Sequence, residues 1–328
     1  MLEQLKRLAK DWFLVGMLLS VVFASLAPDI GRSGGLLHAD VLADYGIFAI
    51  FFLHGIGLST ESLLHGVSRW RVHLLVQLFT FVVFPLLWLL LNVTVGRWLP
   101  RDLMFGFFYL CALPSTISSS VAMTSLARGN VPAAIFNATL STLLGIFLTP
   151  LLVSLIADHQ SGALSLGTAM LNIARLLLLP FVIGQLLRPF LGKWFARYKK
   201  YTNIVDRGVI LLLVFSSFSD SVAGGLWTQH GFGLIFMTLI GASAILFIVL
   251  RLSKWVAQRA HFNTEDEITA VFCASKKTLA SGVPMAKLLF GAHPALGVIV
   301  LPIMFYHQIQ LFTCSILAQR YAKRDLKA

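Results

Sequence analysis

Long apolar segments alternate with short polar ones along almost the whole 328-residue chain. A helix needs about 20 apolar residues to cross the hydrocarbon core of a bilayer. Two segments, 102–126 and 265–290, are apolar at their ends but polar in the middle. Uninterrupted apolar runs lie near residues 12–28, 42–59, 73–95, 131–157, 168–187, 207–225, 231–252 and 294–319. This pattern predicts an all-α polytopic membrane protein with ten transmembrane helices, of which the fourth and the ninth are discontinuous.

The second interrupted segment places two adjacent lysines between apolar flanks. Residues 271–285 have the sequence VFCASKKTLASGVPM, which contains Lys276 and Lys277. A charged side chain at the bilayer centre costs at least ~2.5–3.5 kcal/mol, so it usually faces a protein cavity and marks a functional path. The stretch Thr264–Glu265–Asp266–Glu267 predicts a capping box at the start of this helix. From there to Lys276 is about 16 Å of helix, which is near the middle of the membrane.

The first interrupted segment repeats features of the second. A shift of 162 residues places Cys111, Thr116 and Ser119 on Cys273, Thr278 and Ser281. The spacing from Gly145 to Pro150 recurs from Gly297 to Pro302. Five helices per copy would insert the second copy upside down, and inverted repeats with discontinuous helices are typical of secondary transporters. We therefore predict two inverted five-helix repeats, residues 1–157 and 158–328, whose broken helices cross near the midplane.

Composition and charge support a membrane location. Hydrophobic residues make up 57% of the chain and charged ones 12%, whereas soluble domains carry about 25% charged residues. The net charge of +12 does not indicate a nucleic-acid partner, because positively charged cytoplasmic loops account for it. With a cytoplasmic N-terminus, 19 of the 26 lysines and arginines fall in inner segments and three in outer loops. We expect a multi-pass protein of the inner (plasma) membrane with both termini in the cytoplasm.

Three other features of the chain have simple interpretations. The run from Trp12 to Ala27 follows basic residues and resembles a secretory signal, but its cleavage would leave the second repeat without a counterpart for its first helix. The basic segment 188–207 is predicted to be an interfacial connector between the repeats. The three cysteines lie in apolar runs without metal-ligand spacing, so we expect neither a disulfide framework nor a zinc site.

Polar side chains at and near the two breaks are the candidate groups for binding a substrate or an ion. Where a helix unwinds in a membrane, half-helix N-termini favour anions and freed carbonyls favour cations. The candidates at the breaks are Ser115, Thr116, Ser118, Ser119, Ser275, Lys276, Lys277 and Thr278. The candidates in other apolar runs are Gln77, Asn137, Ser141, Asp220, His307 and Gln308. Each of Gln77, His307 and Gln308 can instead form an ordinary interhelical hydrogen bond.

The roles of the charged candidates stay open. A lysine ammonium can occupy the place of a bound cation or be the titrating group for proton coupling. It can attract the carboxylate or sulfate of an anionic substrate, or it can be structural and bind backbone carbonyls. Asp220 is either a polar partner across a cavity or a structural hydrogen-bonding group near the outer mouth. Metalloprotease, hydrolase and phosphate-loop motifs are missing from the sequence, so we do not expect an enzyme.

The interrupted segments resemble those of a known family. The sequences PSTISSS at 114–120 and FCASKKTLASGVPM at 272–285, with DWF at 11–13 and YHQIQ at 306–310, resemble the bile acid:sodium symporter superfamily. The closest resemblance is to its YfeH-type, SBF-like branch, which is related to the cation/proton antiporters. It implies a panel domain (about 12–59 and 166–225) that moves against a core domain (about 73–157 and 231–319). The broken helices would cross in the core domain.

The same resemblance implies where a sodium ion would bind. Hydroxyl and amide ligands on helices 4 and 5 correspond here to Thr116, Ser118, Ser119, Asn137 and Ser141. On helix 9, the sodium-coupled members supply a glutamate and a glutamine, where this chain has Val271 to Lys277. Two lysines without a carboxylate are electrostatically unfavourable for a sodium ion.

We therefore predict a secondary active transporter that moves a small organic anion by alternating access. The expected coupling ion is sodium or a proton, and no other cofactor is expected. One alternative is a cation/proton antiporter with a lysine switch, and another is a membrane regulator of ion homeostasis with little transport activity. The expected partners are a small solute or ion and the lipid bilayer, and the oligomeric state stays open.

Overall fold

The computed structural model describes residues 12–57, 68–157, 174–225, 231, 233–290 and 293–324, and these ranges are helical without any strand. The first range forms α2 (Trp12–Leu26), α3 (Pro28–Gly31) and α4 (Ala39–Gly57). The second forms α6 (Trp70–Leu78), the π-helical turn η1 (Phe79–Val83), α7 (Phe84–Val95), η2 (Gly96–Trp98), α8 (Arg101–Ala112), α9 (Ile117–Leu126) and α10 (Val131–Ala157). The rest forms η3 (Ala174–Leu178), α12 (Leu179–Ala223), α14 (Gly233–Arg259), α15 (Thr264–Ser275), α16 (Gly282–Phe290) and α17 (Leu296–Ala322). The all-α prediction is confirmed.

The described residues include only some of the predicted membrane spans. Among the described residues, five helices are long and apolar enough to cross a bilayer, and the bent pair α8 and α9 would make a sixth. Shorter apolar stretches lie in α2 and α4. Residues 1–11, 58–67 and 158–173 are outside the described ranges, and they include the basic N-terminus, Asp11 and the predicted start of the second repeat. Ten spans in two inverted repeats therefore remain a prediction.

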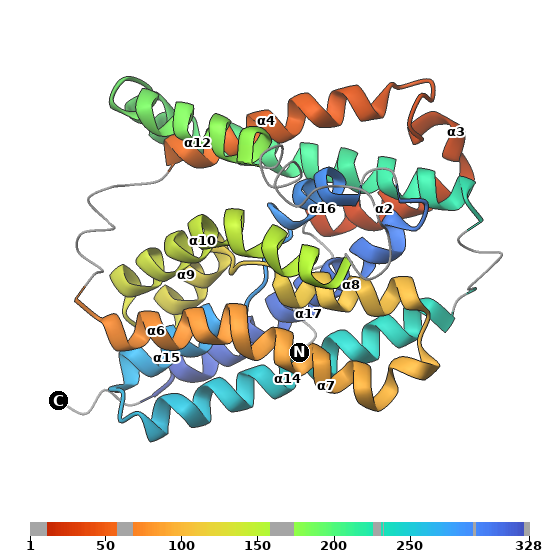
Figure 1. The fold of residues 1–328 in the computed structure, drawn as a ribbon. Helices are drawn as coiled ribbons and strands as arrows, with labels where there is room; N and C mark the ends of the chain where they lie inside the picture. Colours follow the sequence, from red (N-terminus) through yellow and green to blue (C-terminus); the bar gives the residue numbers. More distant parts are fainter. Residues whose placement is uncertain are drawn as a thin grey trace. The chain divides into compact units, whose positions relative to one another are not determined.

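Both segments that were expected to be discontinuous contain a break. Helix α8 ends at Ala112 and α9 begins at Ile117, with axes that differ by 61°, and Figure 1 shows the two as separate helices. Pro114 explains this break, because proline has no amide hydrogen and pushes the preceding residue into an extended conformation. Between α15 and α16 the chain is also extended, with Lys276 at φ −98° and ψ 145°.

Helix α15 starts one residue away from the predicted capping box. The N-cap is Asn263, whose side-chain oxygen accepts a hydrogen bond of 2.8 Å from the backbone N–H of Asp266. Thr264 is already the first helical residue, so the prediction that it caps the helix is wrong. Asparagine is among the best N-cap residues. Asn263, one residue before Thr264, accepts the hydrogen bond from the first-turn amide of Asp266.

The predicted connector between the repeats is helical. Helix α12 runs from Leu179 to Ala223 and is interrupted only by a kink at Tyr198, where φ is −104° and ψ is 16°. The apolar run 207–225 and the basic segment 188–207 therefore belong to one helical stretch. The lysines, arginines and leucines of the segment are good helix formers, so its charge does not end the helix.

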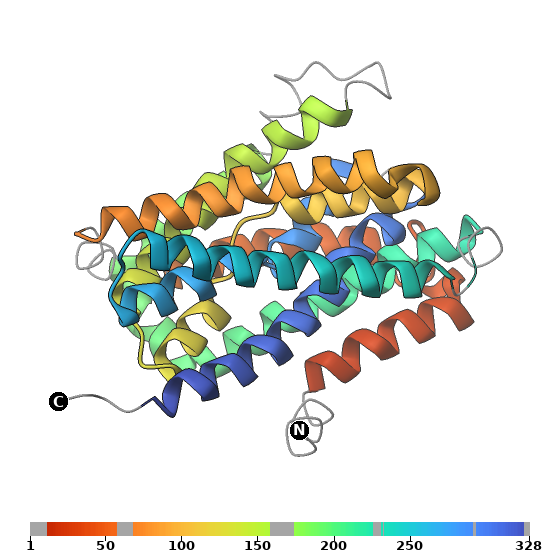
Figure 2. The same cartoon turned by 90° about the horizontal axis from the view of Figure 1, so that it is seen from below.

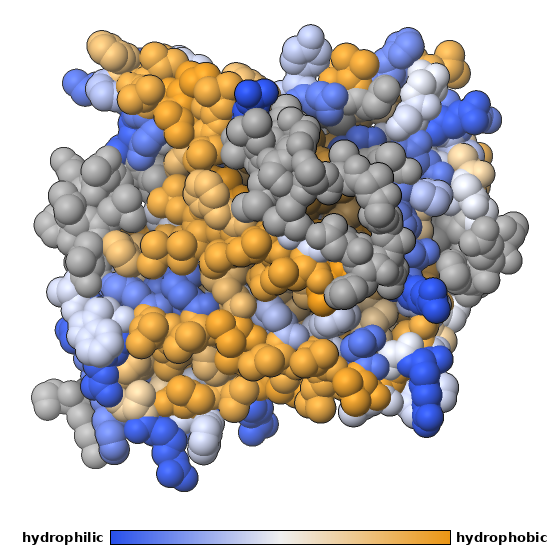
Figure 3. All heavy atoms as spheres, in the orientation of Figure 1, coloured by the Kyte–Doolittle hydropathy of each residue, from blue (hydrophilic) through white to orange (hydrophobic). Residues whose placement is uncertain are grey.

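Contacts divide the chain into two compact units. The first unit comprises Met1–Leu58, Ser154–Ile235 and Ala280–Leu301, and the second comprises Ser59–Val153, Phe236–Leu279 and Pro302–Ala328. In the second unit, α6, η1 and α7 follow one another as one rod (Figure 2), and apolar side chains gather along it (Figure 3). Exposed members of this apolar face include Leu74, Leu78, Leu86, Leu89 and Val93. Such a face suits contact with lipid hydrocarbon. The panel and core domains stay a prediction.

Candidate functional site

The ammonium group of Lys277 is enclosed by backbone carbonyls of the second unit. Its Nζ donates hydrogen bonds to the carbonyl oxygens of Thr80 at 2.9 Å, Cys111 at 2.8 Å and Leu113 at 2.6 Å. The ring centroid of Phe84 lies 4.0 Å from Nζ and adds a cation–π interaction. The side chain is wholly buried. Because an ammonium has three donors, these carbonyls use all of them. We call these three carbonyls the carbonyl cage.

The carbonyl of Thr80 is available because of the π-helical turn η1. In a regular α-helix it would accept the N–H of Phe84, but that N–H bonds to Phe79 instead. The next residue, Pro85, has no amide hydrogen to offer. The irregular turn therefore leaves one carbonyl for Lys277, and π-helical turns of this kind are frequent at functional sites.

The other cage carbonyls are available because α8 ends between them. The last carbonyls of a helix have no partner within it, and here other elements supply donors to the carbonyls of residues 111–114. The amide of Ser115, which would have continued α8, bonds to Ser141 Oγ at 2.9 Å, and Ser115 Oγ donates to the Cys273 carbonyl at 2.7 Å. The carbonyls of Cys111 and Leu113 accept from Lys277, that of Ala112 from Thr149, and that of Pro114 from the amide of Thr278. Polar groups at each break thus form hydrogen bonds with backbone groups of the other break.

Helix α17 fixes the backbone on both sides of the lysines. Gln310 Oε1 accepts from the backbone N–H of Lys277, and Gln310 Nε2 donates to the carbonyl of Lys277, both at 2.9 Å. The hydroxyl of Tyr306 donates to the Ser275 carbonyl at 2.7 Å. The candidate residues named from the sequence include neither Tyr306 nor Gln310. Their spacing of four residues, which puts them on one helix face, could have indicated them.

Lys276 has a different environment from its neighbour. Its Nζ donates to the carbonyl of Ser119 at 3.1 Å, and this side chain is also wholly buried. Ser119 belongs to the first turn of α9, whose N-cap Thr116 makes no capping hydrogen bond with its side chain. Thr116 Oγ1 instead accepts from Ser119 Oγ at 3.3 Å, and Ser118 is exposed. The first turn of α9 therefore lies beside an ammonium and has no side-chain cap.

The polar residues on α6 and α10 hold helices together. Gln77 Nε2 donates to the carbonyl of Asn137 at 3.2 Å, and Asn137 Nδ2 donates to the carbonyl of Ala133 at 3.0 Å. The residues predicted around a sodium ion make separate contacts: Thr116 with Ser119, Asn137 with Gln77, and Ser141 with Ser115. Within the described residues no three His, Cys, Asp or Glu side chains cluster as metal ligands. A sodium site at these residues stays a prediction.

The remaining candidates lie in α12 and α17. Asp220, in the first unit, accepts hydrogen bonds from the N–H of Ser33 at 2.7 Å and from its hydroxyl at 2.9 Å, and it lies 3.9 Å from Lys287 Nζ. This arrangement favours the structural role of Asp220. His307 Nδ1 lies 3.1 Å from Gln310 Nε2, and Gln308 is half-buried on the same helix.

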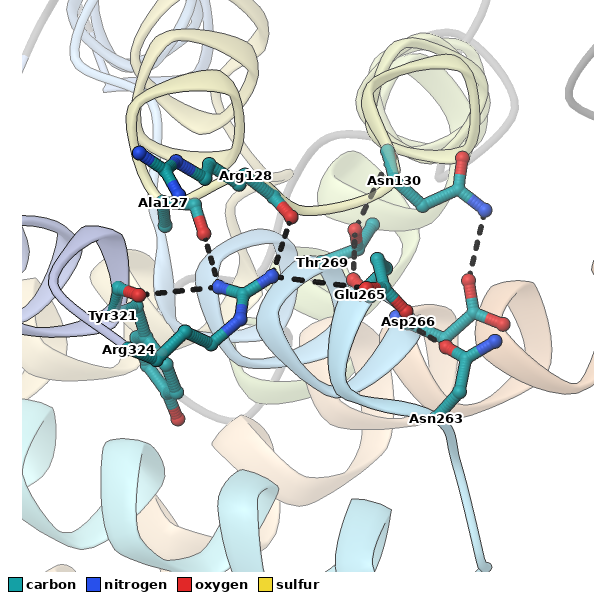
Figure 4. A network of polar contacts seen from close by, with 9 residues as sticks. All are labelled: Ala127, Arg128, Asn130, Asn263, Glu265, Asp266, Thr269, Tyr321 and Arg324. Carbon is teal, nitrogen blue, oxygen red and sulfur yellow. Dashed lines mark hydrogen bonds and ion pairs between the residues drawn. The ribbon is translucent and has the colours of Figure 1, made fainter. Parts of the chain in front are cut away.

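A second polar cluster in the same unit holds the far end of α9 and the start of α15 (Figure 4). Arg324 donates to the carbonyls of Ala127 at 2.5 Å and Arg128 at 2.8 Å, just past the end of α9. Asn130 Nδ2 donates to Asp266 Oδ1 at 2.8 Å. A cation therefore contacts each end of α9, Lys276 at its first turn and Arg324 at its last.

Buried charges at two touching helix breaks, within apolar helices, are typical of membrane transporters. The chain matches the model of the SBF-like CPA transporter family over residues 11–323. It is 45% identical to the uncharacterized protein PA2026 of Pseudomonas aeruginosa, over 97% of this chain and 95% of that protein. It is 42% identical to the putative symporter YfeH of Escherichia coli, covering 96% and 93% of the two chains. It is 32% identical to the sodium/bile acid cotransporter 7-B of Xenopus laevis, covering 95% and 92%.

The chain belongs to the SBF-like CPA transporter family, as its two interrupted segments indicated. The family and the several apolar helices fit an integral membrane protein.

Proposed function

We propose that this chain is a secondary active transporter that moves a small organic anion by alternating access, built as two inverted repeats of five helices. The observation that carries the proposal is the unequal pair of buried ammonium groups at the touching breaks. Lys277 uses all three donors on the carbonyl cage, whereas Lys276 has one acceptor among the described residues. The two lysines then have separate tasks.

Lys277 takes the place of a coupling cation. Three carbonyl oxygens at 2.6–2.9 Å are hard ligands of the kind that an alkali cation prefers, and here a tethered ammonium binds them. Each hydrogen bond to a charged group contributes about 1.5–3 kcal/mol. Three of them outweigh the ~2.5–3.5 kcal/mol that insertion of a lysine at mid-membrane costs. The Lys277 ammonium therefore stays bound in the carbonyl cage, and transport does not need a sodium ion there.

Lys276 and the first turn of α9 provide the anion site. The N-terminus of a helix carries a partial positive charge and free N–H groups, which together favour carboxylate, sulfate or phosphate. In α9 the first turn carries Ser118 and Ser119 and follows the N-cap Thr116, and the Lys276 ammonium donates to its Ser119 carbonyl. We infer that the carboxylate or sulfate of the solute binds here, with Lys276 as its counter-ion.

Lysine and arginine distribution supports an inner-membrane protein with both termini in the cytoplasm. The proton is the proposed coupling ion, since Lys276 has a single acceptor and the cage already holds a cation. The same single acceptor supports a second candidate, a cation/proton antiporter in which Lys276 is the titrating switch.

Uptake into proteoliposomes tests the proposal. The purified full chain is reconstituted and given a mixture of small carboxylates and sulfonates, and internal solutes are identified by mass spectrometry. We expect at least one anion to accumulate, and Lys276→Gln to reduce its initial rate at least tenfold. Lys193→Gln, which changes an exposed lysine of α12, is the matched control and should transport normally.

Three outcomes separate the candidates. Equal anion uptake by Lys276→Gln and the control would remove Lys276 from the anion site. Proton release driven by an alkali-cation gradient, without anion uptake, would favour the antiporter. Neither flux above that of empty liposomes would favour a membrane regulator of ion homeostasis.

A further inference from the structure

A polar pocket of about 280 Å³ opens at the start of α6, against the turn between α14 and α15 in the same unit. The groups that line it include Arg69, Trp70, Arg71, His261 and Asp266. Neither the candidate anion site nor the carbonyl cage uses any of them. The pocket therefore needs its own explanation.

The positive charge of Arg71 is not neutralised in this pocket. Its Nη2 donates to the carbonyl of Ala260 at 3.0 Å, and its guanidinium carbon lies 5.8 Å from the ring centroid of Phe262. These contacts position the group but leave its other donors for a ligand. No carboxylate among the described residues lies within ion-pair distance of Arg71.

The one carboxylate that lines the pocket is already engaged. Asp266 accepts from Asn130 Nδ2 through Oδ1 (Figure 4), and its Oδ2 lies 3.5 Å from Arg69 Nη1. Its side chain is only 7% exposed, so its carboxylate contributes little negative charge to the open side of the pocket. His261 is exposed in the same turn, in a left-handed conformation with φ 56°. The open side of the pocket is therefore positive.

The position of the pocket indicates what kind of anion meets it. The apolar span Trp70–Trp98 has a tryptophan at each end, and tryptophans mark the membrane–water interfaces. Trp70 is 65% exposed and lines the pocket. We therefore expect the pocket to lie at the level of the lipid phosphates. Arginine is well suited to bind phosphate, because two of its N–H groups match two phosphate oxygens.

We propose that this pocket binds the phosphate group of an anionic phospholipid headgroup, with Arg71 as the main contact and His261 as a second donor. The bound headgroup contacts the turn that leads into α15, next to Asp266. It therefore stabilises the start of the broken helix. This inference does not depend on which solute the chain carries.

Lipid binding to the purified full chain in detergent tests the site. The probes are phosphatidylglycerol, phosphatidylcholine and inorganic phosphate, each added alone, and the readouts are lipid retention in native mass spectrometry and thermal unfolding. We expect phosphatidylglycerol to bind and stabilise the wild type, and Arg71→Gln to weaken that binding at least fivefold. Arg97→Gln is the matched control, because its guanidinium lies 4.2 Å from the Trp98 ring at the other end of the same span.

Equal phosphatidylglycerol binding by Arg71→Gln and Arg97→Gln would overturn the proposal. Arg71-dependent binding of inorganic phosphate without any preference for phosphatidylglycerol would overturn the lipid assignment. If Arg71→Gln does not fold, Arg71→Lys and His261→Gln are compared instead, and each should weaken phosphatidylglycerol binding. Wild-type binding in both of these variants would also overturn the proposal.

Discussion

Replacing Lys277 with methionine removes the ammonium and keeps a flexible side chain of similar length. Three buried carbonyls then lose their donor, those of Thr80, Cys111 and Leu113. A buried acceptor without a partner costs about 1–3 kcal/mol, so three cost about 3–9 kcal/mol. Loss of the charge also relieves a desolvation penalty, which partly offsets this cost.

Comparison with Lys276→Met cancels the contribution of desolvation. This substitution deletes an equally buried ammonium from the neighbouring residue, so the relief of desolvation is similar in both variants. Lys276 contacts only one carbonyl among the described residues. The difference between the two variants is therefore the cost of two further carbonyls, about 2–6 kcal/mol, together with the lost cation–π interaction of Lys277 with Phe84.

Unfolding of the purified full chain in detergent, followed by tryptophan fluorescence against denaturant and temperature, measures this difference. Lys277→Met should be clearly less stable than Lys276→Met. Lys277→Gln should lie between wild type and Lys277→Met, because its amide keeps two N–H donors. Equal stability of the two methionine variants, or a larger loss for Lys276→Met, would refute the carbonyl cage as a stabilising element.

Three further substitutions probe the breaks and the far end of α9. Ser141→Ala removes the acceptor of the buried Ser115 amide and should lower the free energy of unfolding by about 1–3 kcal/mol, measured in denaturant. Gly145→Ala places a methyl carbon 2.6 Å from the ring of Pro114, so a thermal melt should show a loss of about 1–3 kcal/mol from overpacking. Arg324→Gln removes the charged donor from the carbonyls of Ala127 and Arg128, just past the end of α9, and hydrogen exchange should become faster at residues 124–130.

Each of these predictions has a control or a contrary outcome. Gly208→Ala adds a methyl group where no atom lies within 4 Å, and it should be neutral or slightly stabilising; equal losses at both glycines would contradict the packing argument. Wild-type stability of Ser141→Ala would mean that the Ser115 amide has another partner. Unchanged exchange in Arg324→Gln would show that α9 ends without help from this arginine.

The positions of both helix breaks could be predicted from the sequence, because their causes are local. Pro114 cannot continue a helix, and two lysines with several hydroxyls cannot lie in an unbroken lipid-facing one. The bounds of α10, Val131–Ala157, also agree with the predicted run. In contrast, the separate runs before and after the basic segment 188–207 are one kinked helix, since charge alone does not end a helix.

The partners of the lysines could not be predicted, because they depend on backbone groups that a sequence does not display. The Thr80 carbonyl is available only because, in η1, the amide of Phe84 bonds to the carbonyl of Phe79. The hydrophobic pattern of the sequence does not indicate a π-helical turn. The side chain of Gln310, on α17, forms hydrogen bonds with the backbone of Lys277. This contact depends on how helices distant in sequence pack together. The sequence correctly indicated a charged break, but the different hydrogen-bond partners of Lys276 and Lys277 are visible only in the structure.

We propose that the Lys277 ammonium replaces an exchangeable coupling cation. Uptake of the transported anion into proteoliposomes, compared in sodium and in choline buffers at the same pH and ionic strength, tests it most directly. We expect equal initial rates in the two buffers. A rate at least tenfold higher in sodium would show that a free cation still binds and drives transport, and that Lys277 does not replace it.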